Sequence, residues 1–469
     1  MSPLFHSSIA RLTAGIRSKK ISPVEVVDTL IERASDCEAQ LNCFVHLDAD
    51  SARQQARAAE AAVLRGDALG QLHGLPVTIK SCIDIAGWPC PAGSTLRKDY
   101  IPQRDAPLVA RLKAAGAIIL GNTNTPEFLM AYESNNLLTG KTSNPWDLER
   151  TAGGSSGGEA AAIAAGCSMG GVGGDGGGSI RVPAHFSGIC GLKPTPGRIP
   201  STGHFPPAEG ALSWLGVVGP MARTVADVCE LFEVLAGPDP GDALSAPVPL
   251  RTIERGRLKG TRIGVLESEA FGKITPETQS TVKRAAEFLA AQGFIVEPLA
   301  LKGLARAIEL WWFFFGPTIA QLFGPIVAGH EDQVSPMLRE YLSCAEPENP
   351  LTLDQFLAAC AEREFVRADI LRQMKDVPIL LSPVSSAPAF RHGEGTWRAG
   401  AEHCYRDTMR HSQWLNLTGF PGASVPFGSS PEGLPIGVQV IGRPYEEELV
   451  LAVAERIEEA RGPWQPPPL

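Results

Sequence analysis

The chain has 469 residues, of which 44% are hydrophobic, and a formal net charge of −9, so it is long and apolar enough for a large core. No block of lysine and arginine stands out, and we therefore expect no nucleic-acid partner. The 10 cysteines are scattered without a Cys-x-x-Cys pair, and residues 1–20 lack a continuous apolar segment; these features predict a cytoplasmic protein with reduced thiols and no secretory signal.

The first 230 residues predict helices followed by alternating strands and helices. Residues 1–65 are helical, with Ser22 as the N-cap of a helix that begins with proline. Further on, residues 108–115 and 159–165 predict helices, and residues 117–120 predict a strand. Alternation of this kind is typical of a mainly parallel sheet with helices on both faces.

The second half of the chain is less regular. Residues 236–260 are rich in proline, glycine and aspartate and predict a long connection. We expect strands at 260–266 and 376–383, and helices at 275–292 and 446–461. Residues 300–375 predict mostly helix.

One uncharged stretch, residues 310–329, is long enough to suggest a membrane span. Two Gly-Pro pairs, at 316–317 and 324–325, interrupt it, and proline breaks the hydrogen-bond ladder of a helix. We therefore expect no membrane span but a buried or pocket-lining pair of helices. The alternative is a surface patch that meets a subunit or a membrane.

Two serines lie in glycine-rich turns near the middle of the sequence. Ser155 belongs to the segment GGSSGG at 153–158, and Ser179 follows the three glycines at 176–178. Backbone N–H groups can converge in such turns, because glycine adopts unusual backbone angles without steric cost. Converging N–H groups stabilise an anion or a developing oxyanion.

A lysine supplies the third group. Lys80 ends the apolar run 74–80, which predicts a short buried strand. Burial disfavours a charged amine and lowers its pKa from the ordinary value of ~10.4. A neutral amine can take the proton of a serine hydroxyl, which needs such a base to become a nucleophile. One lysine, two serines and a set of glycine N–H groups together predict acyl-transfer chemistry.

Other interpretations of these segments have less support. Residues 153–157 fit the pattern G-x-S-x-G, but a nucleophile elbow needs a preceding apolar strand, and residues 145–151 are polar. Residues 171–176 fit G-x-G-x-x-G, but no helix opens after them. We assign Ser156 as the N-cap of the helix expected near residue 158. The sequence has no His/Cys spacing typical of metal ligands, so we expect neither a metal nor another cofactor.

These motifs resemble those of the amidase signature family of serine hydrolases. The resemblance covers residues 22–27, 153–158, 177–183, 188–195, 416–421 and 433–439. It implies an α/β fold: a three-layer α/β/α sandwich around a central mixed, twisted sheet. It also implies a single amidase domain over 1–469, made of N-terminal helices at 1–65, a catalytic core at 66–235, a variable, mostly helical substrate-shaping region at 236–375, and strands and a helix at 376–469 that complete the core.

The resemblance also implies roles for the matched residues. Ser179 would be the nucleophile, Ser155 the bridging serine that passes its proton on, and Lys80 the base. In the family, the peptide bond before the bridging serine is cis. The implied oxyanion hole is formed by the backbone N–H groups of Gly176, Gly177, Gly178 and Ser179.

The chain departs from the family pattern at two points. Ser81 follows the lysine where aspartate is common, which leaves the role of the lysine unaffected. Gly174 and Gly176 flank Asp175 where larger residues are common, which makes the loop more permissive. We interpret Asp175 and Arg181 as a structural pair that anchors this loop.

The resemblance implies an amidase that hydrolyses a carboxylic amide to acid and amine through an acyl-enzyme on Ser179. The alternative is the glutaminase subunit of a tRNA-dependent amidotransferase, which channels ammonia to a partner; a binding protein without activity is not favoured, because all three positions are intact. We expect a small-molecule amide substrate, no nucleic acid, and a homodimer as one possible assembly. Candidate substrate-binding residues are Met130, Tyr132, Phe186, Ile189 and Trp311.

Trp311 opens the aromatic run at 311–315. If this run lines the pocket, the substrate carries an aryl or apolar acyl group. Ordinary core packing is the alternative for the run.

Overall fold

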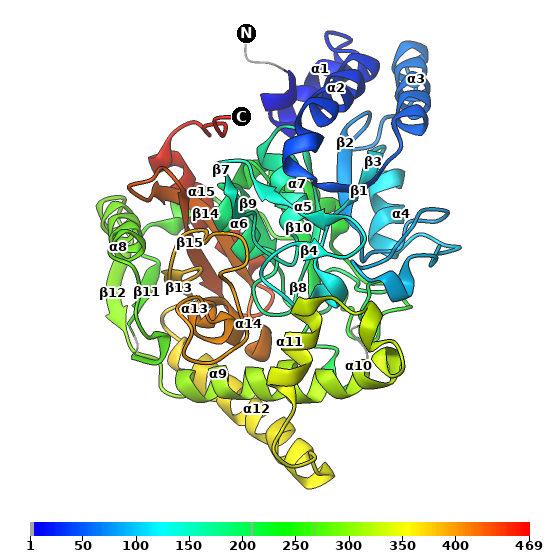
Figure 1. The fold of residues 1–469 in the computed structure, drawn as a ribbon. Coiled ribbons are helices and arrows are strands. Elements are labelled where there is room, and N and C mark those ends of the chain that lie inside the picture. The colour runs from blue at the N-terminus through cyan, green and yellow to red at the C-terminus, as the bar shows by residue number, and fades with distance from the viewer. Residues whose placement is uncertain (1–3, 208–209, 268) are drawn as a thin grey trace.

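The computed structural model describes residues 4–207, 210–267 and 269–469 (Figure 1). An 11-stranded sheet runs through this described part in the order β1-β3-β2-β8-β10-β9-β14-β15-β13-β11-β12. Its strands are β1 (Phe44–Leu47), β2 (Pro76–Lys80), β3 (Ile118–Thr123), β8 (Gly170–Asp175), β9 (Cys190–Lys193), β10 (Val217–Ala222), β11 (Arg262–Leu266), β12 (Ile295–Leu299), β13 (Ile379–Pro383), β14 (Gly422–Ser429) and β15 (Pro435–Gly442). Two small sheets pair β4 (Asn135–Asn136) with β5 (Gly140–Lys141), and β6 (Ser143–Asn144) with β7 (Asp147–Thr151).

The large sheet is mixed, as the resemblance implied, and the expectation of a mainly parallel sheet was wrong. Parallel pairing is confined to two groups, β3-β2-β8 and β13-β11-β12, and the remaining neighbours pair antiparallel. A helix between two strands gives a parallel pair where it returns the chain to the same end of the sheet, as α4 (Pro107–Ala114) does between β2 and β3. The strands β14 and β15 follow each other directly and therefore run antiparallel.

Helices lie against both faces of the sheet (Figure 1). Successive residues of a strand face opposite sides, so the contacts of β8 identify the two layers. A Cβ added at Gly170 would lie 2.8 Å from Leu231 of α7 (Val225–Leu235), whereas one at Gly171 would lie 2.0 Å from Glu159 of α5 (Gly157–Ala164). The glycines of β8 therefore let two helices approach the sheet closely from opposite sides.

Most helices begin and end close to where the sequence predicts. The helix α2 (Pro23–Leu41) starts after Ser22, whose hydroxyl accepts hydrogen bonds from two backbone N–H groups of the first turn. The helices expected at 108–115, 159–165, 275–292 and 446–461 are confirmed as α4, α5, α8 (Pro276–Ala291) and α15 (Glu447–Arg461). The remaining helices are α1 (Ile9–Arg17), α3 (Ala49–Arg65), α6 (Arg181–Ser187), α9 (Leu304–Phe313), α10 (Ile319–Val327), α11 (Pro336–Ala345), α12 (Leu353–Gln373), α13 (Tyr405–Thr408) and α14 (Arg410–Thr418).

The stretch at 310–329 is helical through both Gly-Pro pairs, contrary to the expected interruption. The helix α9 continues through a π-helical turn (Phe314–Thr318) into α10. The wider turn accommodates Pro317, and the Thr318 hydroxyl donates to the carbonyl of Phe313 at 2.9 Å. By length and composition alone, Leu304–Val327 is the one helix of the described chain that could cross a membrane, and 39% of its most apolar window is buried inside the protein.

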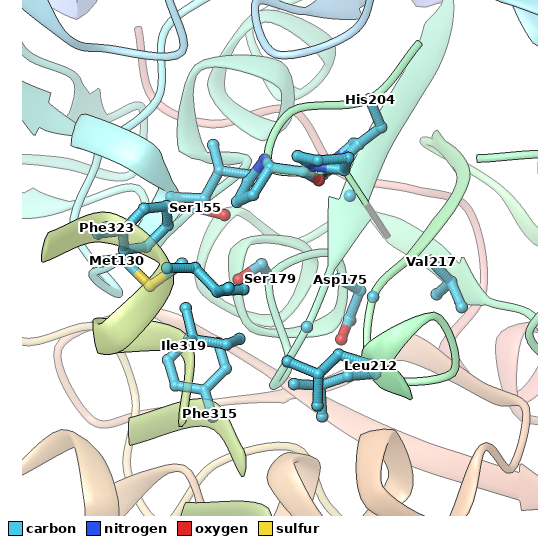
Figure 2. A pocket seen from close by; sticks show the side chains of 18 residues that line it. Met130, Ser155, Asp175, Ser179, His204, Leu212, Val217, Phe315, Ile319 and Phe323 are labelled. Carbon is cyan, nitrogen blue, oxygen red and sulfur yellow. Dashed lines mark hydrogen bonds between the residues drawn. The ribbon is translucent and has the colours of Figure 1, made fainter. Parts of the chain in front are cut away.

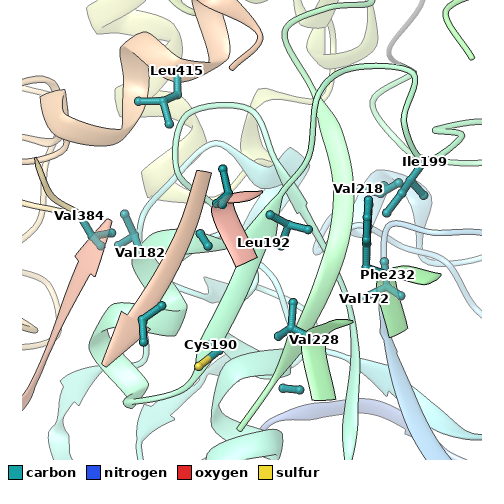
Figure 3. Close-up of a cluster of buried hydrophobic side chains, with 14 of the residues drawn as sticks. Val172, Val182, Cys190, Leu192, Ile199, Val218, Val228, Phe232, Val384 and Leu415 are labelled. Atoms are coloured by element: carbon teal, nitrogen blue, oxygen red, sulfur yellow. The ribbon is translucent and has the colours of Figure 1, made fainter. Parts of the chain in front are cut away.

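A cluster of buried hydrophobic side chains packs β8 and β10 against the helix α7, close to the strand ends that carry the site. Val172 of β8 and Val218 of β10 lie in one buried cluster with Val228 and Phe232 of α7 (Figure 3). Burying a side chain of this kind contributes ~1.5–3 kcal/mol relative to leaving it exposed. The cluster therefore holds β8 and β10 together in the middle of the sheet, where the carboxyl end of β8 lies beside the amino end of β10.

Candidate active site

The site lies where the parallel strands β2 and β8 end. Their register pairs Thr78 with Gly171, so the last residues of both strands reach the same edge of the sheet. The strand β2 ends at Lys80, and β8 ends at Asp175. Ligand sites of open α/β sheets lie at the carboxyl ends of the strands, which makes this edge the first place to look for chemistry.

Lys80 is fully buried, and its Nζ donates to Ser155 Oγ at 2.6 Å. Burial lowers the pKa of this amine to about 8, although negative groups nearby oppose the shift. Near that pH a large fraction of the lysine is neutral and carries a lone pair. The same contact can then transfer a proton from the hydroxyl to the amine.

Two buried acids act on the charge of this amine, and both are engaged by other groups. Glu159 accepts hydrogen bonds from the hydroxyls of Thr78 and Thr123, and burial raises its pKa to about 7. Asp175 forms a buried ion pair with Arg181 at 2.9 Å. Burial opposes ionisation of Asp175, but the guanidinium beside it holds the pKa of the carboxyl well below its usual range. The predicted structural pair is thus confirmed.

Two adjacent serines make different contacts. Ser155 follows a cis peptide bond, and its carbonyl accepts a hydrogen bond from the Thr125 hydroxyl at 2.7 Å. Ser156 occupies the N-cap position of α5 as predicted, but its side chain does not cap the helix. Its hydroxyl instead bonds to the backbone of Gly174 in β8. Ser155 therefore faces Lys80, while Ser156 ties the turn to the neighbouring strand.

Ser179 lies between β8 and α6 and lines the same pocket as Ser155 (Figure 2). The predicted oxyanion hole needs a correction at one of its four donors. The N–H group of Gly178 donates to Asp175 Oδ1 at 2.7 Å and is therefore not available to a substrate. The N–H groups of Gly176, Gly177 and Ser179 remain as candidates.

The pocket at Ser179 contains about 740 Å³ of empty space, part of which is open solvent, and its exposed lining is mainly apolar. Of the five candidate substrate-binding residues, Met130 alone lines it. None of the described lining residues is a lysine or an arginine. Its other large apolar side chains are Leu129, Leu212, Leu215, Val217, Phe315, Ile319, Leu322 and Phe323.

Phe186 and Ile189, two of the candidate substrate-binding residues, are core residues, which corrects their assignment. Phe186 belongs to the main core and packs edge-on against Phe390, and Ile189 belongs to a small buried cluster with Ile163. The helix α6, which follows Ser179 and carries Phe186, packs against β14 and β15.

Tyr132 and Trp311 do not line the pocket of Ser179 either. They lie behind the loop that precedes this serine. The Tyr132 hydroxyl donates to the carbonyl of Gly177 at 2.6 Å, and the Trp311 indole donates to the carbonyl of Gly176 at 2.9 Å. These residues therefore contact the backbone of the candidate oxyanion loop instead of a substrate.

Sequence reasoning missed the part of the pocket that residues 204–207 and 212–217 supply. His204 lies there with its Nδ1 3.0 Å from the carbonyl of Pro206, and burial lowers the pKa of its imidazole to about 4. The only local signal was the turn-forming Gly203 and the following prolines, which mark a loop. Among the described residues, no group of three or more His, Cys, Asp or Glu side chains could hold a metal ion.

The arrangement supplies the parts that acyl transfer requires. A buried base contacts one hydroxyl, a second serine lies in the same apolar pocket, and backbone N–H groups lie beside it. Preorganised N–H donors stabilise the negative charge that develops on a carbonyl oxygen under attack.

Comparison with known proteins places this geometry in a family. The family model described as amidase matches residues 25–451. A glutamyl-tRNA(Gln) amidotransferase subunit from Roseiflexus castenholzii is 36% identical to the chain, over 97% of this chain and 96% of the relative.

Two solved structures are also similar over nearly the whole chain. One belongs to a complex described as vestigial and linked to the origin of an s-triazine catabolic enzyme; it has a TM-score of 0.88, 28% identity, and coverage of 98% of this chain and 100% of the other. The second is a bacterial aryl acylamidase of the amidase signature family, with a TM-score of 0.87, 27% identity, and coverage of 99% and 98%.

These relatives contradict the expectation of a small-molecule substrate without nucleic acid or partner subunits. The amidotransferase relative is named as one subunit of an enzyme that acts on glutamyl-tRNA(Gln), which favours our alternative function over the main one. The expectation of no nucleic acid rested on the lack of a lysine and arginine block, and the sequence of one chain does not report on surfaces that other subunits contribute. The chain belongs to the amidase family and has the fold of the amidase signature enzymes.

Proposed function

We propose that the chain cleaves a carboxylic amide through an acyl-enzyme on Ser179, with Ser155 and Lys80 as its proton relay. The observation that carries this proposal is the 2.6 Å contact between Lys80 Nζ and Ser155 Oγ, made by a buried amine at the pocket that also contains Ser179. The membership of the amidase family supports an amide C–N bond as the bond that is cleaved.

The proposed reaction has two halves. In the first, neutral Lys80 takes the proton of Ser155, and Ser155 takes the proton of Ser179. At the same time, the Ser179 oxygen attacks the amide carbon. The N–H groups of Gly176, Gly177 and Ser179 stabilise the oxyanion, and the protonated lysine returns its proton through Ser155 to the leaving amine. In the second half, water attacks the acyl-enzyme and gives its proton to the same relay, which returns a proton to the Ser179 oxygen as the acid leaves, so that Ser179, Ser155 and neutral Lys80 are restored.

The pH dependence of the reaction follows from the pKa of Lys80. This pKa is lowered to about 8 by burial, and the base must be unprotonated. We therefore expect kcat/KM to rise about tenfold per pH unit below pH 8 and to level off above it. A pH–rate profile measured from pH 5.5 to 10 checks this. A plateau that extends down to pH 6 would contradict a lysine base.

We propose further that the chain acts as the amidase subunit of a tRNA-dependent amidotransferase and releases ammonia from glutamine. The support is the 36% identity to one subunit of such an enzyme over almost the full length of both chains. The test is purification of the tagged chain from its own host. We expect stoichiometric partner proteins and a glutaminase activity that requires them. An isolated chain that is fully active on other amides, without partners, would contradict this assignment.

One observation favours a second candidate, an amidase for an apolar acyl or aryl group. The described pocket lining has no lysine or arginine to pair with the carboxylate of a free amino acid, whereas Leu215, Phe315 and Ile319 line it. A panel of glutamine, aryl amides, fatty amides and small aliphatic amides separates the two candidates. The second candidate predicts that kcat/KM increases with the apolar area of the acyl group.

A substitution in the pocket sharpens this comparison. If an apolar acyl group binds against Ile319, Ile319→Ala should lower kcat/KM for a long-chain amide by about tenfold or more and leave acetamide hydrolysis almost unchanged. Ile326→Ala is the matched control, because Ile326 lies on the same helix, is 40% exposed and is not part of the pocket lining. Equal losses for both amides would argue against an acyl-binding role.

A further inference from the structure

Three consecutive carbonyls of the loop before Ser179 accept hydrogen bonds from side chains of three distant segments. Asn416 Nδ2 of α14 donates to the carbonyl of Asp175 at 2.8 Å. Trp311 Nε1 of α9 donates to that of Gly176 at 2.9 Å, and Tyr132 Oη donates to that of Gly177 at 2.6 Å. All three donor residues are buried. The loop is therefore held from outside, one peptide group after another.

This pattern determines where the N–H groups of the loop point. The cis peptide bonds of the described chain precede Ser155 and Pro206, so those of the loop are trans. In a planar trans peptide, the carbonyl of one residue and the N–H of the next point in opposite directions. The hydrogen bond from Asn416 to the Asp175 carbonyl therefore sets the direction of the Gly176 N–H. In the same way, the hydrogen bond from Trp311 to the Gly176 carbonyl sets the direction of the Gly177 N–H.

The third peptide group follows the same rule. The bond from Tyr132 to the Gly177 carbonyl sets the direction of the Gly178 N–H, which donates to Asp175 Oδ1 at 2.7 Å. Two donors of the loop thus stay available for a substrate, while the third anchors the loop to its own strand.

The loop cannot hold this geometry by its own backbone preferences. Glycine adopts many backbone angles, so residues 176–178 need external contacts to stay in one arrangement. These contacts are close: a Cβ added at Gly177 would lie 2.5 Å from the Trp311 ring and 2.8 Å from Tyr132 Oη. The glycines therefore serve to admit the anchoring side chains as well as to expose N–H groups.

We propose that Trp311, Tyr132 and Asn416 are positioning residues that preorganise the oxyanion hole, an inference that rests on the proposed acyl-enzyme at Ser179. Trp311 has the most direct effect, because its indole N–H orients the peptide group whose N–H belongs to Gly177. Its ring also stacks on Phe315, at 4.5 Å between centroids, and Phe315 lines the pocket. The Trp311 indole thus contacts both the loop before Ser179 and a side chain that lines the pocket at Ser179.

The test is a pair of substitutions that each remove one hydrogen-bond donor and keep an aromatic ring, Trp311→Phe and Tyr132→Phe. Loss of an oxyanion donor itself costs ~10²–10³ in kcat, so we expect Trp311→Phe, which misaligns the Gly177 N–H, to lower kcat by about 10- to 100-fold, with KM within about twofold. Tyr132→Phe should lower kcat in the same direction but by less, because the peptide group that it orients anchors the loop through the Gly178 N–H. Trp312→Phe is the matched control: its indole lies beside Trp311, Trp397 and Arg406, and among the described residues no hydrogen bond joins it to residues 175–179. It should retain wild-type kcat.

A second measurement separates orientation of the oxyanion hole from simple packing. A boronic acid analogue of the best substrate forms a tetrahedral adduct with Ser179 and places a charged oxygen in the hole, whereas the corresponding primary alcohol does not. We expect Trp311→Phe to weaken boronate binding by the same factor as kcat/KM and to leave alcohol binding unchanged. Equal losses for both ligands, or wild-type kcat in both variants, would overturn the inference.

Turnover and labelling of the wild-type enzyme separate an error in the proposed function from an error in the role of Trp311. A wild-type enzyme that neither turns over an amide nor labels at Ser179 with a fluorophosphonate would overturn the proposed function and this inference with it. A wild-type enzyme that labels and turns over, beside a Trp311→Phe variant of equal kcat, would overturn the inference alone. Tyr132→Phe removes a single oxygen atom and keeps the test valid if the tryptophan variant does not fold.

Discussion

Replacing Ser179 by alanine is expected to lower kcat by about 10⁵- to 10⁶-fold, the effect found when a serine nucleophile is removed. The change deletes one hydroxyl at the edge of a pocket, and the loop around it is held by the pair of Asp175 and Arg181. The fold should therefore survive with a Tm within a few degrees of the wild-type value. Steady-state kinetics and thermal unfolding check the two halves of this expectation, and the variant should show no mass shift after fluorophosphonate treatment.

The two serines of the turn before α5 provide an internal control. Ser155→Ala removes the partner of Lys80 and should also lower kcat strongly, whereas Ser156→Ala removes a hydroxyl that bonds to Gly174. We expect the Ser156 variant to lose stability but to keep most of its kcat. Near-normal turnover by the Ser179 variant, or equal losses in both variants of the turn, would contradict the assigned roles.

Lys80→Met is expected to have the second large effect. Methionine fills the buried site with a similar volume but removes the base, and loss of a general base costs ~10²–10⁴ in rate. The remaining activity should no longer increase as the pH is raised toward 8, because the variant lacks the amine that titrates there. Measuring kcat and the rate of Ser179 labelling across pH tests both points.

The chain offers a matched control in a second buried lysine. Lys193 is fully buried, its Nζ donates to the carbonyls of Pro194 and Phe420, and burial lowers its pKa to about 7. Lys193→Met should destabilise the protein, since two carbonyls lose their donor, but it should preserve the rise in activity toward pH 8. If both lysine variants had the same kinetics, burial of a lysine alone would explain the effect.

The contact of Lys80 with Ser155 and the place of Ser179 in the same pocket were predictable from the sequence, because these residues lie in short motifs whose geometry is local. The turn with Ser155, the loop with Ser179 and the strand that ends at Lys80 are each read within a few residues. The pair of Asp175 and Arg181 is equally local, since only five residues separate its members. Helices with strong end signals were also predictable from the local sequence, and the helix that Ser22 caps is an example.

The pocket and its supports were not predictable, because they depend on contacts between distant segments. The hydrogen bond from Trp311 to Gly176 joins residues 135 positions apart, and no local pattern distinguishes it from core packing. The helix that continues through Pro317 depends on a π-helical turn, which the simple rule for proline does not anticipate. The antiparallel centre of the sheet likewise depends on strand order, and periodicity does not encode strand order.

The proposed mechanism requires that burial lower the pKa of the Lys80 amine far enough for a substantial fraction of it to be neutral at the pH at which the protein acts. Selective ¹³Cε labelling of lysine, followed by NMR across pH, measures this directly. We predict one lysine resonance that titrates near pH 8 and is absent from Lys80→Met, distinct from the resonance that Lys193→Met removes. A Lys80 resonance that stays protonated above pH 10 would contradict it.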